Sequence, residues 1–121
     1  VVIDNNTLLK ALQAIDALVS KQLIQQQQHK QFYVELIDIC RQFSDTVLHQ
    51  QTKSATTDEY MLQVKGWVGA ETMQTKYFQL LRLADVVKFA KYIPNDALSE
   101  NAITTAKELV NTLFHYNQKR A

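Results

Sequence analysis

Acidic side chains are the first candidates for chemistry in this sequence, since paired carboxylates can bind metal ions or move protons. Glu35 and Asp38 stand three residues apart in a predicted helix, a spacing used in di-metal bundles, but no Glu-x-x-His motif accompanies them. Asp58 and Glu59 follow Thr56 in the stretch TTDE, which has the form of a helix capping box. These four acids are therefore assigned to solvent exposure or to capping.

Asp85 has no such assignment, because it interrupts the apolar stretch LADVVKFAKYIP at residues 83–94. The polar residues of this segment recur every third position: Gln79, Arg82, Asp85, Lys88 and Lys91. Three residues rotate an α-helix by about 300°, which is about 60° short of a full turn. The five side chains therefore turn steadily around the helix and cannot share one solvated face. We expect neighbouring segments to cover this helix and Asp85 to be architectural. It would either cap a new helical turn or accept hydrogen bonds from Arg82, Lys88 or another segment. The alternative is a carboxylate on an interaction surface.

Cysteine, histidine and glycine give no catalytic motif. Cys40 lies on an apolar stripe and is predicted to be a small core residue. The three histidines stand in or beside polar connections, where we expect them to be solvated, and no two have the spacing of a zinc-binding helix. Two glycines in the whole chain exclude the usual phosphate-binding loops. We therefore predict a protein that is not an enzyme and has no catalytic residue, metal or cofactor.

Aromatic residues outside the predicted core offer a different kind of site. Trp67 stands in the loop GWVGAE, where it either closes one end of the bundle or anchors a partner, since Trp is enriched in interface hot spots. Tyr116 and Phe114, near the end of the chain, leave the same two alternatives open. The structural or interaction candidates are Asp85, Trp67, Lys88, Arg82 and Tyr116.

Helices must position these residues, because Gly and Pro are scarce and apolar side chains recur with helical spacing. We predict helices over about 5–25, 30–49, 57–65 and 72–92, and a fifth after Pro94 that Asn95 or Ser99 can cap. The glutamine-rich residues 25–31 predict a solvated connection, although glutamine also permits a continuous helix. The fold class is all-α, a five-helix bundle with a short third helix, forming a single domain over 1–121. Its core should include Phe43, Leu81 and Phe89.

Composition limits the possible partners. The chain has 13 Lys and Arg against 12 Asp and Glu, a balance that argues against a dedicated nucleic-acid-binding protein. Its single cysteine excludes an internal disulfide, and no apolar run reaches the roughly 20 residues of a membrane helix. Because the chain begins with Val1 rather than Met, we expect it to be a piece of a longer protein.

Three segments, QFYVELIDICRQF, ATTDEYM and LLRLADVVKFAKYIP, occur in that order and suggest a family. They resemble the cytosolic helical domain of bacterial membrane proteins tied to the Bat aerotolerance cluster, notably the BatD-like proteins and a related family of unknown function. The resemblance covers about residues 10–113. It implies a membrane helix upstream, a location on the cytoplasmic side of the inner membrane, and MoxR-type ATPases or von Willebrand A-type membrane proteins as partners.

These observations favour a non-enzymatic protein-interaction or scaffold module. A first alternative is a regulatory module that binds a small ligand in the core of the bundle. A second is a weak nucleic-acid contact through Lys88, Lys91, Lys119 and Arg120. An exposed apolar patch would favour protein interaction, a closed apolar cavity would favour the ligand, and a shared basic face would favour nucleic acid.

Overall fold

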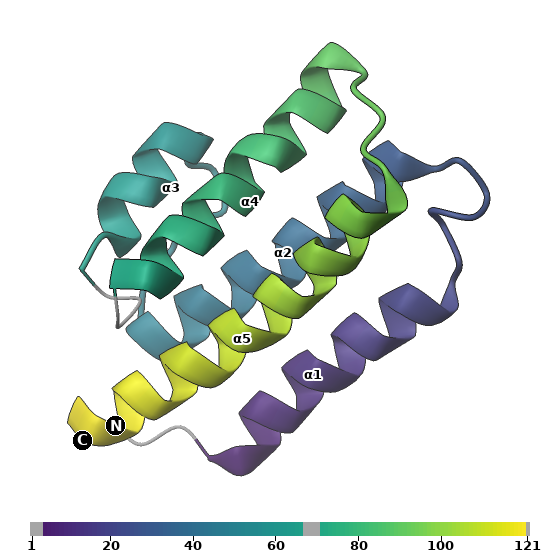
Figure 1. Cartoon of the computed structure of the whole chain (residues 1–121). Coiled ribbons are helices and arrows are strands. Elements are labelled where there is room, and N and C mark those ends of the chain that lie inside the picture. Colours follow the sequence, from purple (N-terminus) through teal and green to yellow (C-terminus); the bar gives the residue numbers. More distant parts are fainter. Residues whose placement is uncertain (1–3, 67–70, 121) are drawn as a thin grey trace.

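The computed structural model describes residues 4–66 and 71–120 of the chain, and this part contains five helices and no strand (Figure 1). The helices are α1 (Asn5–Ser20), α2 (His29–Leu48), α3 (Thr57–Val64), α4 (Glu71–Ala90) and α5 (Asp96–Arg120). The predicted all-α bundle is confirmed, and its third helix is short, with eight residues.

The central helices are α2 and α5, each of which packs against α1, α4 and the other. The short α3 lies against α4 on the outside of the bundle (Figure 1). Because α4 runs antiparallel to α5, the C-terminal end of α4 and the start of α5 meet at one end of the molecule. The connection between α1 and α2 lies at the same end (Figure 1).

The first helix is shorter than predicted, since it ends at Ser20 instead of continuing to about residue 25. Gln22 and Gln27 have left-handed backbones, with φ of 54° and 62°, which a continuous α-helix does not allow. The turn between them places Leu23 in the core, while residues 25–28 remain exposed. Residues 25–28 are therefore a solvated connection, as one of the two alternatives expected, whereas residues 29–31 already belong to α2.

The second helix begins with a buried histidine, which corrects the expectation that all three histidines are solvated. His29 shares a helix face with Phe32 and Tyr33, three and four residues further on, and both of these side chains are buried. The ring therefore sits on the core side of the first turn, with its Nε2 atom 3.4 Å from Oε1 of Gln27.

Local capping starts two of the helices as the sequence predicts. Thr56 Oγ1 accepts a hydrogen bond of 3.2 Å from the N–H of Glu59, and Glu59 Oε1 accepts one of 2.8 Å from the N–H of Thr56. The capping box is complete, and these bonds lower the pKa of Glu59. At α5, the side chain of Asn95 accepts from the N–H of Leu98 at 2.8 Å.

The predicted core is right for two of three residues. Phe43 and Leu81 are buried, but the side chain of Phe89 is 75% exposed. The buried face of α4 includes Leu81, Ala84 and Val87. Phe89 follows Leu81 by eight residues, a rotation of about 80° that turns it off this face. The end of α4 also projects beyond the start of α5 (Figure 1), and the side of its last turn that carries Phe89 stays exposed although Val87 on the other side is buried.

Candidate functional site

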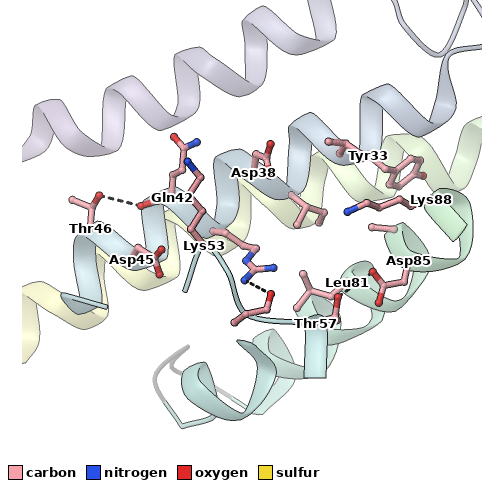
Figure 2. Close-up of a pocket in the computed structure, with 15 residues that line it drawn as sticks. Tyr33, Asp38, Gln42, Asp45, Thr46, Lys53, Thr57, Leu81, Asp85 and Lys88 are labelled. Atoms are coloured by element: carbon pink, nitrogen blue, oxygen red, sulfur yellow. Dashed lines mark hydrogen bonds between the residues drawn. The ribbon is translucent and has the colours of Figure 1, made fainter. Parts of the chain in front are cut away.

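An open cleft of about 620 Å³ lies between α2 and α4, and the connection from α2 to α3 closes one side (Figure 2). Its apolar lining includes Val34 and Ile37 from α2 and Leu81 and Ala84 from α4. Charged side chains of both signs surround this lining: Asp38, Arg41, Asp45, Lys53, Asp85 and Lys88. The cleft contains two of the candidates predicted from sequence, Asp85 and Lys88.

Two of these charged residues hold the connection between α2 and α3. Both carboxylate oxygens of Asp45 bind Thr52, which donates from its N–H at 3.1 Å and from its hydroxyl at 2.7 Å. Arg41 donates to the carbonyl oxygens of Thr52 and Ala55, and its guanidinium carbon lies 4.4 Å from the centre of the Tyr60 ring. Asp45 and Arg41 thus have a structural role, because they hold the connection between α2 and α3 in place through hydrogen bonds.

Asp85 is half-buried and accepts a hydrogen bond of 3.0 Å from the hydroxyl of Thr57, the first residue of α3 (Figure 2). The helix continues through Asp85 to Ala90, so Asp85 does not cap a new turn. Of the arrangements expected from the sequence, the structure shows a continuous helix and a donor from another segment. The cover over Asp85 is less complete than expected, since the side chain keeps contact with solvent.

The other predicted candidates lie in different surroundings. Arg82 forms an ion pair of 2.9 Å with Asp58 on the exposed side of α3, and not with Asp85. Lys88 has no carboxylate partner among the described residues, and its Nζ atom lies 5.2 Å from the centre of the Phe89 ring. Tyr116 is half-buried near the end of α5 and is not part of the cleft. Trp67 lies outside the described residues.

The remaining acids do not form a metal site. Glu35 binds Nζ of Lys21 at 2.6 Å, and this bond together with one from Gln31 lowers its pKa. Its neighbour Asp38 is exposed in the cleft. Within residues 4–66 and 71–120, no group of three or more His, Cys, Asp or Glu side chains is placed to hold a metal ion.

A buried hydroxyl network beneath the cleft joins three helices. The hydroxyl of Tyr60 lies 2.7 Å from that of Ser44 and 2.6 Å from that of Tyr77. Burial raises the pKa of both tyrosines, and it raises the pKa of the fully buried Cys40 to about 12. These groups therefore stay protonated at neutral pH, which suits hydrogen bonding and packing and not nucleophilic attack.

A group of exposed apolar residues lies where α4 ends, close in sequence to Asp85 and Lys88 of the cleft. We call it the α4 tip and define it as Val86, Phe89, Tyr92 and Ile93, which are 44%, 75%, 45% and 66% exposed. Val86 and Phe89 are three residues apart on the outer face of α4. The N–H of Tyr92 donates to the Val86 carbonyl at 3.4 Å, which folds the connection back onto the helix. The sequence-based prediction did not identify this surface, because it placed Phe89 in the core. The rotation of about 80° between Leu81 and Phe89 is the signal that separates Phe89 from the buried face.

Comparisons with known proteins add no relative: no protein-family model, curated protein or solved structure matches the chain. Among the described residues, no helix combines the length and apolar character needed to cross a membrane. The structure thus defines an all-α helical bundle with an open cleft and an exposed apolar tip.

Proposed function

We propose that this chain is a non-enzymatic protein-interaction or scaffold module and that the α4 tip is its contact surface. The observation that carries this proposal is the exposure of four large apolar side chains at one end of α4. Exposing such side chains to water is unfavourable, and neighbouring exposed apolar groups are typical of interaction sites. Phe89 and Tyr92 also belong to the aromatic residues that are enriched at interfaces.

The two alternatives have less support. The clefts found in the described residues are open to solvent, whereas a ligand buried in the core would need an enclosed cavity. Lys88 and Lys91 lie where α4 ends, but α5 ends at Arg120 at the opposite end of the bundle (Figure 1). The backbone positions of the four basic residues expected to contact nucleic acid therefore fall at two different ends of the bundle, which does not favour one shared basic surface.

The resemblance to BatD-like proteins supplies the partners to test. We propose a MoxR-type ATPase or a von Willebrand A-type membrane protein as the partner. We further propose a position on the cytoplasmic side of the inner membrane, reached through a segment upstream of this chain. A partner that recognises the α4 tip would bury Phe89, which is the most exposed of its apolar side chains.

Titration calorimetry with a purified MoxR-type ATPase from the same genome tests the proposal. We expect binding that weakens at least about tenfold in Phe89→Ser, which corresponds to about 1.4 kcal/mol. Leu62→Ser is the matched control, because Leu62 is 73% exposed but lies on α3, away from the tip. The proposal would be overturned by binding that Phe89→Ser leaves unchanged, or by no binding to either a MoxR-type ATPase or a von Willebrand A-type protein.

A further inference from the structure

A second apolar surface lies near the α4 tip, at the same end of the bundle. It is an open cleft of about 370 Å³ formed by the end of α1, the connection to α2 and the start of α5. We call it the α1/α5 cleft. Its apolar lining is formed by Leu18, Val19, Leu23, Ile24, Phe32 and Ile103. Asp96 and Glu100, one turn apart on α5, also line it.

The α1/α5 cleft and the α4 tip carry opposite charges. Asp96 and Glu100 form no ion pair within the described parts of the chain. Lys88 and Lys91, next to Phe89 and Tyr92, likewise have no carboxylate partner there. An apolar projection with unpaired ammonium groups thus lies close to an apolar hollow with unpaired carboxylates. Complementary charges of this kind orient two surfaces and select between partners.

The positions of the two surfaces suit contact between two molecules. The end of α4 projects beyond the start of α5 (Figure 1). The α1/α5 cleft, in contrast, is a hollow of about 370 Å³. The connection at residues 91–95 joins them, and Ile93 is only three residues from Asp96. When two complementary surfaces adjoin on one face, a two-fold axis beside them allows each copy to offer its projection to the hollow of the other.

We propose that the α4 tip binds the α1/α5 cleft of a second copy of this chain, so that two copies form a symmetric dimer. In this dimer, Phe89 enters the apolar cleft of the other copy, and Lys88 and Lys91 face its Asp96 and Glu100. This inference rests on the proposed function, because it uses the same tip as the contact surface. Small interfaces are typically transient, and exposed ion pairs are screened by salt. The dimer should therefore be weak and should weaken further as salt is added.

Analytical ultracentrifugation of the 121-residue chain, from micromolar to millimolar concentration, tests this dimer. We expect the average mass to rise with concentration and to fall when salt is added. The double variant Lys88→Glu, Lys91→Glu should weaken the dimer at least about tenfold, because each tip then meets a cleft of its own charge. The control is Lys10→Glu, Lys65→Glu, which makes the same change in net charge at exposed positions elsewhere.

A mixing experiment makes the test specific. The variant Asp96→Lys, Glu100→Lys should also be monomeric, since both its tip and its cleft are basic. Mixed with Lys88→Glu, Lys91→Glu, it should form a heterodimer, because each acidic surface then meets a basic one. Asp96 lies in the first turn of α5, where lysine is unfavourable, so Glu100→Lys alone provides a second version that keeps the helix start. Circular dichroism checks that each variant is folded.

Three outcomes would overturn the dimer: a monomer at every concentration, a dimer that Lys88→Glu, Lys91→Glu weakens no more than the control does, or failure of the charge-reversed variants to pair. A monomer that binds vesicles of phosphatidylglycerol through Phe89 would assign the tip to a membrane surface instead. A monomer that binds the ATPase through Phe89 would overturn the dimer and leave the proposed function standing. A dimer formed through the tip, with no binding to the proposed partners, would overturn the proposed function and leave the dimer standing.

Discussion

The hydroxyl of Thr57 donates a hydrogen bond of 3.0 Å to the carboxylate of Asp85, and this bond joins the first residue of α3 to α4. Both side chains are half-buried, so the bond is only partly shielded from water. These helices are also linked by the buried hydroxyls of Tyr60 and Tyr77, 2.6 Å apart, and by an exposed ion pair from Arg82 to Asp58 of the kind that contributes little to stability. Asp85 therefore has a defined part in attaching the short third helix.

Asp85→Ala should lower the free energy of unfolding by about 1 kcal/mol, since it removes the acceptor for Thr57 while solvent can still reach the site. Thr57→Val should have a similar effect, and the double variant should cost less than the sum of the two, because both changes remove the same bond. Urea denaturation followed by circular dichroism measures all three. If Asp85→Ala leaves stability unchanged yet abolishes partner binding, Asp85 belongs to the interaction surface.

The buried tyrosines should differ in their sensitivity to loss of the hydroxyl. Tyr60 bonds to both Ser44 and Tyr77, so Tyr60→Phe leaves the hydroxyl of Tyr77 buried with no partner among the described residues. We expect this change to cost about 1–3 kcal/mol. Tyr77→Phe leaves Tyr60 bonded to Ser44 and should cost about 0.5–1.5 kcal/mol. Equal losses of stability in the two variants, measured by thermal or urea unfolding, would show that Tyr60 does not link Ser44 to Tyr77 in this way.

Core truncations should separate buried apolar residues from the tip. Phe43→Ala should cost about 3–5 kcal/mol and Leu81→Ala about 2–5 kcal/mol, because both side chains are buried. Phe89→Ala should change the free energy of unfolding by less than about 0.5 kcal/mol, as expected for an exposed position. A large loss of stability in Phe89→Ala would mean that the tip packs within the chain and is not available to a partner.

Alkaline pH should destabilise the fold through its buried acidic groups. Burial raises the pKa of Cys40 from 9.0 to about 12, and it also raises the pKa of Tyr60 and Tyr77 above 10.0. Above pH 9 the unfolded chain loses these protons before the folded chain does, so the free energy of unfolding must fall as pH rises. Well below pH 9 the three groups are protonated in both states and contribute no slope.

Urea denaturation at a series of pH values measures this fall. In Cys40→Ala, the part that begins near pH 9 should disappear, so that the decline starts nearer the ordinary tyrosine pKa of 10.0. Free energies of unfolding that stay level or rise above pH 10 would contradict the burial of these groups.

Much of the local structure was predictable from neighbouring residues. The capping box at Thr56 and Glu59 requires only four consecutive positions, and Asn95, one of the two caps expected after Pro94, is the one that caps α5. The end of α1 was harder to predict, because glutamine is compatible with a helix and the left-handed turns at Gln22 and Gln27 have no glycine to mark them.

The sequence by itself determined the five helices and their order, because apolar spacing and capping residues act within one or two turns of the chain. Only the tertiary structure decided which faces of the helices are covered. Asp85 meets Thr57, which is 28 positions away, and Phe89 remains exposed since α4 projects past its neighbour. Burial of a side chain depends on segments far apart in the sequence, and these come together only when the whole bundle is packed.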